Sequence, residues 1–88
     1  MLLEANFLIV RYEPAIGALI RAAVEKDKNL IIGKRQWQDK TRINLVLTLN
    51  VPDTDDDGEK LSFMYSVERF TRRLEDAGAL VEARKNAT

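Results

Sequence analysis

Ile43-Asn-Leu-Val-Leu-Thr-Leu-Asn-Val51 is the stretch of sequence that decides the fold. Apolar residues occupy every second position from Ile43 to Val51, and the intervening positions are Asn44, Val46, Thr48 and Asn50. A period of two is typical of a β-strand with one buried face. We therefore predict a strand whose other face, mostly polar, meets water or a partner. Pro52 ends this strand.

Two further strands are predicted on the amino-terminal side of this stretch. The segment 30–37 reads as a strand that leads into a turn at 38–41, so that it forms an antiparallel hairpin with the strand beginning at Ile43. The run Asn6-Phe-Leu-Ile-Val-Arg-Tyr12 is nearly continuously apolar. Such a run favours a central strand that is buried on both faces.

Two amphipathic helices separate these strands. Pro14 suits the first turn of a helix that ends near 27–29. Its apolar stripe consists of Ile16, Leu19, Ile20, Ala23 and Val24. A second helix is predicted over 59–77, with Gly78 placed to cap its carboxyl end. Its stripe consists of Phe63, Val67, Phe70, Leu74 and Ala77. The segment 79–81 reads as a short last strand, and 82–88 as its polar end and tail.

The order of these elements is β-α-β-β-α-β, which is the ferredoxin-like arrangement. Right-handed crossovers in both β-α-β units place the two helices on one face of the sheet. We therefore predict an α+β protein with a four-stranded antiparallel sheet, folded as one domain over residues 1–88.

Composition excludes several function classes. The 88 residues include 14 basic and 14 acidic side chains, so the formal net charge is zero. There is no Cys and no His, which removes disulfides, thiolate metal sites and the commonest general base. We expect no enzyme and no cofactor. The lack of Cys is consistent with a cytoplasmic protein, and no run of residues is long enough to span a membrane.

The acidic loop Asp53-Thr-Asp-Asp-Asp-Gly58 resembles the first half of a calcium-binding EF-hand loop. Asp53, Asp55 and Asp57 stand at alternate positions, as carboxylate ligands would. The second half does not fit, because Met64 stands where a bidentate Glu is needed. The loop reads better as a solvated acidic turn before a helix, and no metal site is favoured.

A basic hairpin surrounds the single Trp of the chain. Its residues are Lys34, Arg35, Trp37, Lys40 and Arg42. Cations interleaved with an aromatic ring can contact phosphates and stack on a base, so nucleic-acid binding is one hypothesis. The alternative is a soluble charged hairpin with its Trp packed on a neighbour, and the zero net charge favours that alternative. The second helix carries three arginines, at positions 69, 72 and 73. They are candidates for binding an anion, and the alternative is that they form a solvent-exposed face of the helix.

Local sequence also resembles ACT-like regulatory modules. Glu13-Pro14-Ala-Ile-Gly17 is similar to the turn that opens the first helix of that family, although Glu replaces Asp and Gly17 does not directly follow Pro14. Lys28-Asn29-Leu30 and the segment 42–49 are similar to its second-strand entry and third strand. The resemblance implies a module that pairs edge to edge, sometimes binds a small ligand such as an amino acid at the pair interface, and regulates a partner. Glu13, Pro14 and Gly17 are the ligand-binding candidates that it implies.

The leading hypothesis is a non-enzymatic regulatory or protein-interaction domain that associates with itself or with a larger protein. An open sheet leaves two edges with unpaired backbone groups, which a second copy can satisfy. Small-ligand sensing is a variant of this hypothesis, and nucleic-acid binding through the basic hairpin is the alternative. The predicted interaction surface joins the hairpin residues to Asn44 and Thr48 on the polar side of the third strand.

Overall fold

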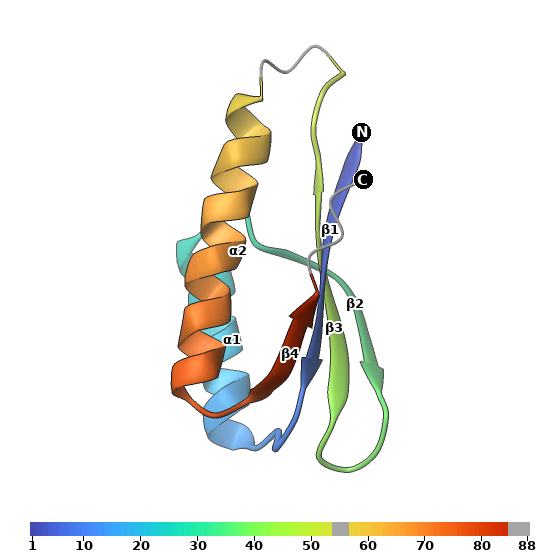
Figure 1. Cartoon of the computed structure of the whole chain (residues 1–88), viewed down its shortest axis with the longest axis vertical. Helices are drawn as coiled ribbons and strands as arrows, with labels where there is room; N and C mark the ends of the chain where they lie inside the picture. Colours follow the sequence, from blue (N-terminus) through green and yellow to red (C-terminus); the bar gives the residue numbers. More distant parts are fainter. Residues whose placement is uncertain (54–56, 85–88) are drawn as a thin grey trace.

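The computed structural model describes residues 1–53 and 57–84, with side chains described as far as Leu80. Six elements follow one another along the chain (Figure 1). They are β1 (Leu2–Ile9), α1 (Pro14–Lys26), β2 (Ile31–Trp37), β3 (Ile43–Asn50), α2 (Gly58–Asp76) and β4 (Leu80–Arg84).

Three of the strands form the body of an antiparallel sheet. β3 lies in the middle and pairs with β1 on one side and β2 on the other. β4 pairs only with Asn6–Ile9 of β1, and its register shifts between Leu8 and Ile9. The predicted ferredoxin-like four-stranded sheet therefore needs correction: the sheet has three antiparallel strands, β1-β3-β2, to which the five-residue β4 is added over half of the β1 edge.

The first strand also differs from its prediction. β1 covers Leu2–Ile9 rather than 6–12, and only alternate residues are buried, starting at Leu3. Its residues Leu2 to Ile9 pair in register with Asn50 to Ile43 of β3. Arg11 adopts φ 55°, a left-handed conformation that interrupts the strand before α1. The apolar run after Asn6 misled the prediction, because Leu8 and Val10 lie on the less buried side.

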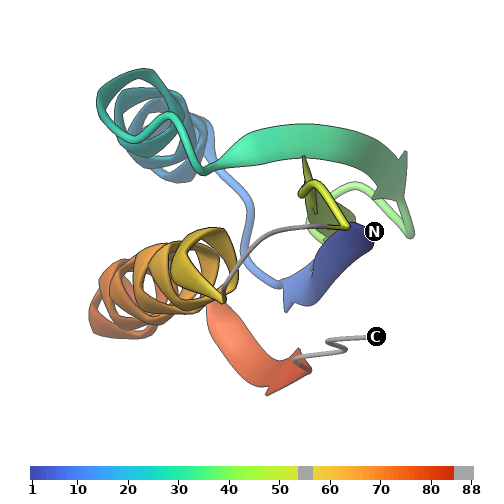
Figure 2. The ribbon, with the colours of Figure 1, turned by 90° about the horizontal axis from the view of Figure 1, so that it is seen from above.

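Both helices pack against the same face of the sheet, and the opposite face has no described element over it (Figure 2). The core lies between these layers. β1 contributes Leu3, Ala5, Phe7 and Ile9, and β3 contributes Ile43, Leu45 and Leu47. From the helices come Ile16, Ile20, Ala23, Phe63, Val67, Phe70 and Leu74. This confirms the central part of both predicted helical stripes, whereas Ala77 is exposed.

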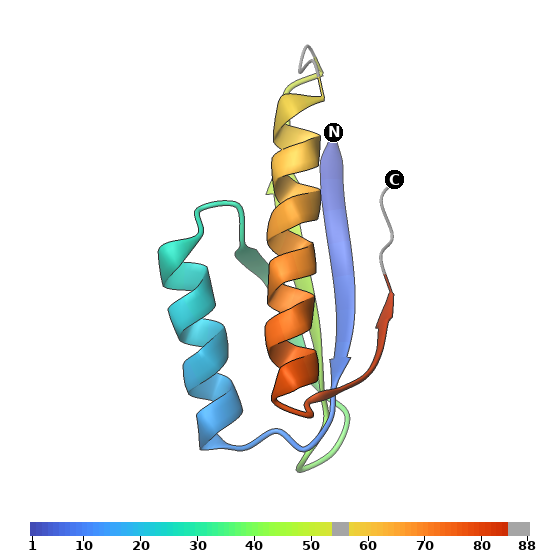
Figure 3. The same ribbon diagram turned by 60° about the vertical axis from the view of Figure 1, so that its left-hand side comes forward.

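The two helices differ in length, and this shapes the domain. α1 has 13 residues and α2 has 19. α2 extends well beyond the end of α1 along the sheet (Figure 3). At its other end, Gly78 has φ 71° and its backbone N–H donates to the carbonyl of Glu75. This confirms the predicted glycine cap, since a left-handed residue after a helix is cheapest for Gly.

Candidate functional site

The open face of the sheet is a surface that the sequence pattern singles out. Paired residues of neighbouring strands share a face, so the register defines its members. They are Leu2, Glu4, Asn6 and Leu8 of β1, Ile31, Lys34 and Gln36 of β2, and Asn44, Val46, Thr48 and Asn50 of β3. We call these residues the open face. Over β1, β2 and β3 only Glu4 and Lys34 on this face are charged, although 32% of the chain is charged. The register of β4 additionally places Glu82 opposite Leu8 and Arg84 opposite Asn6.

The two charges of the open face lie on opposite sides of β3. Glu4 pairs with Thr48, whereas Lys34 pairs with Val46 two residues further along. Their Cα atoms are two strand spacings apart across the sheet and two residues apart along it, which gives a separation of roughly 12 Å. Thr48 and Val46 therefore mark the centre of the face, between one anion and one cation.

A β-bulge at Gly33 brings Lys34 to this face. The register shifts between Ile32 and Lys34, which leaves Gly33 without a partner in β3. Regular alternation after Ile32, which packs against the core, would have turned Lys34 towards the helices. A Cβ atom on Gly33 would lie 2.5 Å from Cγ2 of Thr48, so the close approach of the two strands requires glycine here.

The same bulge bears on the predicted edge-to-edge association. β2 is the edge strand of the sheet and carries the bulge together with two adjacent cations, Lys34 and Arg35. Bulges and cations on an edge strand are features that prevent pairing with another strand. β1 is partly covered on its second edge by β4. Self-association through the β2 edge therefore has an obstacle that the sequence pattern did not reveal.

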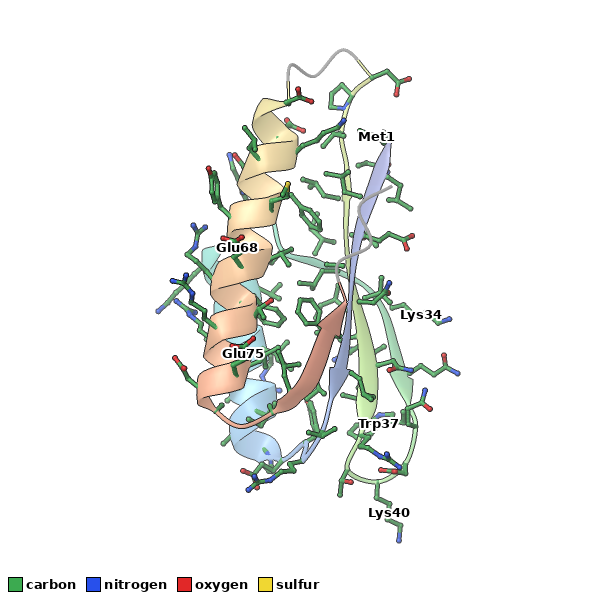
Figure 4. The ribbon with its side chains drawn as sticks, viewed as in Figure 1. Met1, Lys34, Trp37, Lys40, Glu68 and Glu75 are labelled. Carbon is green, nitrogen blue, oxygen red and sulfur yellow. The ribbon has the colours of Figure 1, made fainter. Side chains whose placement is uncertain are left out.

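The basic hairpin does not form one patch. Lys34 belongs to the open face, whereas Arg35 and Trp37 pair with core-facing residues of β3 and lie on the helix side. The Trp37 ring is 5.0 Å from that of Tyr12, in an edge-to-face arrangement, and the residue is 55% exposed. Lys40 lies at the hairpin tip, away from both Lys34 and Trp37 (Figure 4).

Asp39 stabilises the hairpin turn and forms an ion pair with Arg42. Its Oδ1 atom accepts hydrogen bonds from the backbone N–H groups of Thr41 and Arg42. Its Oδ2 atom lies 2.6 Å from Nη2 of Arg42. The bond from the Thr41 backbone, together with the Arg42 side chain, lowers the pKa of Asp39 to about 2. Arg42 is therefore part of the turn rather than a free cation for a ligand.

The residues carried by the ACT-like resemblance lie at the amino end of α1. Glu13 caps the helix without a side-chain hydrogen bond, and Pro14 is its first residue. A Cβ atom on Gly17 would lie 2.7 Å from the Tyr12 hydroxyl, so the Tyr12 ring occupies the space beside it. The neighbouring cavity has a volume of about 30 Å³, which holds one water molecule rather than an amino acid.

The acidic segment is only partly described, since Asp55 lies outside the described residues. Asp53 lies 3.4 Å from the amino group of Met1, and Asp57 lies 3.6 Å from the ammonium of Lys60. Within 1–53 and 57–84, no group of three carboxylate or other ligand side chains is placed to hold a metal ion.

A cleft that the sequence did not predict lies where α2 faces the end of α1 and the connection to β2. Its volume is about 580 Å³. Arg69 Nη2 lies 3.3 Å from both the Asp27 carboxylate and the Ser66 hydroxyl, and the Asn29 side-chain amide donates to Ser66 at 3.4 Å. Ser66 is fully buried. The only sequence signal was the basic run on the second helix.

No protein-family model, curated protein or solved structure matches the chain. Among the residues that the structure describes, no helix is both long and apolar enough to cross a lipid bilayer.

Proposed function

We propose that this protein is a non-enzymatic interaction domain that forms a homodimer by packing open face against open face. The observation that carries the proposal is the charge pattern of that face. Over β1, β2 and β3 it carries only Glu4 and Lys34 as charged residues, and it mixes aliphatic residues with Asn, Thr and Gln. Depletion of charge at the centre of a surface patch is the compositional mark of an interface.

The positions of the two charges suit a symmetric pair. A twofold axis that lies parallel to the two sheets and passes between Thr48 and Val46 exchanges the positions of Glu4 and Lys34. Glu4 of each copy then faces Lys34 of the other, as an isologous interface requires. A face of three strands lies at the small end of specific interfaces, below about 1,200 Å² in total, so we expect dissociation constants in the micromolar range.

Charge reversal tests this arrangement. Glu4→Lys and Lys34→Glu each place like charges opposite one another across the twofold axis, and we expect each to weaken the dimer by about tenfold or more. The double reversal restores the opposite charges and recovers the association. Lys40→Glu is the matched control, because it makes the same charge change at the hairpin tip.

Sedimentation equilibrium over a concentration series measures the outcome. A wild-type protein that stays monomeric at millimolar concentration would refute the dimer. If the single reversals weaken the dimer and the double reversal does not recover it, the dimer uses another surface.

Regulation of a larger partner, of the kind that ACT-like modules perform, is a further part of this proposal. A dimer that responds to a ligand can pass the response to such a partner. The absence of His and Cys from the whole sequence supports a non-enzymatic role. The absence of Cys also supports a cytoplasmic location. Nucleic-acid binding gains less support, because Lys34 and Trp37 lie on opposite faces of β2.

A further inference from the structure

The cleft between α2 and the end of α1 is distinct from the open face, since it lies on the helix side of the sheet. Its walls come from segments about forty residues apart in sequence. The α1 end and its connection to β2 contribute Lys26, Lys28 and Asn29, and α2 contributes Ser66, Arg69 and Arg73. Ala23, Leu30 and Phe70 provide apolar lining.

Positive charge predominates in this cleft. Four of its residues are cationic, namely Lys26, Lys28, Arg69 and Arg73, and two are anionic, namely Glu25 and Asp27. The chain as a whole has zero net charge, so this excess is local. In Figure 4, Glu68 and Glu75 of α2 lie on the side of the helix that faces the viewer, whereas α1 lies behind α2. These two carboxylates are therefore on the side of α2 away from α1.

The Asp27 carboxylate, which lines the cleft, already has hydrogen-bond partners. Burial of Asp27 raises its pKa, but bonds from the Ser66 hydroxyl, the Asn29 backbone and the Arg69 guanidinium outweigh burial, so the net pKa is lowered. Asp27 is therefore an anion paired with Arg69. Lys28 and Arg73, in contrast, form no ion pair with any described residue, and they stand on different walls of the cleft.

We propose that this cleft binds the phosphate group of a small phosphorylated molecule. Lys28 and Arg73 line the cleft from separate elements, which suits a dianion with several terminal oxygens better than a single carboxylate. Asn29 adds a side-chain amide donor beside them. The volume of about 580 Å³ exceeds that of phosphate and falls in the range of small-molecule sites. The cleft also borders Leu30 and Phe70, which are buried residues of the core.

A titration followed by amide NMR shifts tests the site, with inorganic phosphate and ribose 5-phosphate as the probes. Sodium chloride at matched ionic strength provides the salt control. We expect both phosphates to shift the amide signals of Asn29 and Arg73, and chloride to leave them in place. Tighter binding of ribose 5-phosphate supports an organic phosphate as the ligand, whereas equal affinities support free phosphate. If neither probe shifts these signals beyond the chloride control, the proposal is overturned.

Matched double variants show whether the named cations bind the probe. Lys28→Gln with Arg73→Gln removes the two unpaired cations, and we expect phosphate affinity to fall about tenfold or more. Lys40→Gln with Arg72→Gln makes the same change in net charge at exposed positions that do not line the cleft. Equal affinities of the two double variants would overturn the proposal. All four residues are exposed, so both variants are expected to fold, which circular dichroism checks.

Discussion

Arg69 of α2 lies with its Nη2 atom 3.3 Å from Oδ2 of Asp27, the residue that caps the carboxyl end of α1. These residues are 42 positions apart in sequence, and their ion pair joins the two helices. The backbone N–H of Asn29 donates to the other carboxylate oxygen of Asp27, at 3.0 Å. Asp27 thus links the end of α1 to α2.

Asp27 makes the stability of the domain depend on pH. Although burial raises its pKa, the hydrogen bonds lower it below the ordinary value of 3.8. A folded-state pKa below the unfolded one gives a stabilising contribution above pH 3.8, which is lost as the pH falls through the folded pKa. We expect the difference in unfolding free energy between wild type and Asp27→Asn to shrink between about pH 6 and about pH 2.

Urea unfolding of both proteins across this pH range measures the difference. At neutral pH we expect Asp27→Asn to be less stable by about 1–3 kcal/mol, because a charged hydrogen-bond partner is lost. Arg72→Gln serves as the control for a change of charge at an exposed position. A difference between wild type and Asp27→Asn that is independent of pH would contradict the argument.

Asp39 is expected to titrate far below an ordinary carboxyl group. The backbone of Thr41 and the side chain of Arg42 bind its charged form, which lowers the pKa to about 2. Its stabilising contribution is therefore present above pH 3.8 and is lost as the pH falls towards about 2. Carboxyl carbon shifts followed by NMR give the midpoint directly. Arg42→Gln should raise that midpoint, and an unchanged midpoint would exclude the ion pair in solution.

Gly33 and Thr48 are expected to be energetically coupled. A Cβ atom on Gly33 would lie 2.5 Å from Cγ2 and 2.8 Å from Oγ1 of Thr48, so Gly33→Ala forces the Thr48 side chain or its strand to shift. We expect a loss of about 1–3 kcal/mol in unfolding free energy. Thr48→Ala removes both atoms, so the double variant should recover most of the loss. A double-mutant cycle measured by chemical denaturation gives the coupling, and additive effects would contradict the contact.

Phe70 is expected to dominate the core. It is 1% exposed, and its ring meets that of Phe7 edge to face, with centroids 5.3 Å apart. Phe70→Ala should cost roughly 3–5 kcal/mol, a large share of the stability of so small a domain. Tyr65→Ala is the matched control on the same helix. Tyr65 is 58% exposed, so its loss should cost less than about 0.5 kcal/mol. Thermal unfolding compares the two.

The strands differ in how much of their structure could be predicted from sequence. β3 was predicted to within a residue of its ends, because strict alternation specifies both the strand and its buried face. β1 was placed four residues too late, since Leu2 to Ala5 lack the β-branched and aromatic residues that mark Phe7 to Val10. β4 could be inferred only from its position, and the extent of its pairing depends on tertiary contacts with β1.

The candidate surfaces were predicted less well than the elements. Neighbours in sequence such as Lys34 and Arg35 were grouped into one site, although adjacent residues of a strand face opposite sides. The bulge at Gly33 then decides which of the two reaches the open face, and no sequence pattern showed the bulge. The cleft was also missed. It depends on the distance between two helices, which the periodicity of each helix alone does not specify.

The greater length of α2 has a consequence for how the domain opens. Beyond the end of α1, only α2 covers the paired ends of β1 and β3 (Figure 3). β2 pairs with β3 only as far as Thr48, so Leu49 and Asn50 of β3 are paired with β1 alone. Amide protons at this end of the ladder should exchange with solvent through local fraying. Those of Leu45 and Phe7, flanked by strands on both sides, should exchange only when the whole domain unfolds.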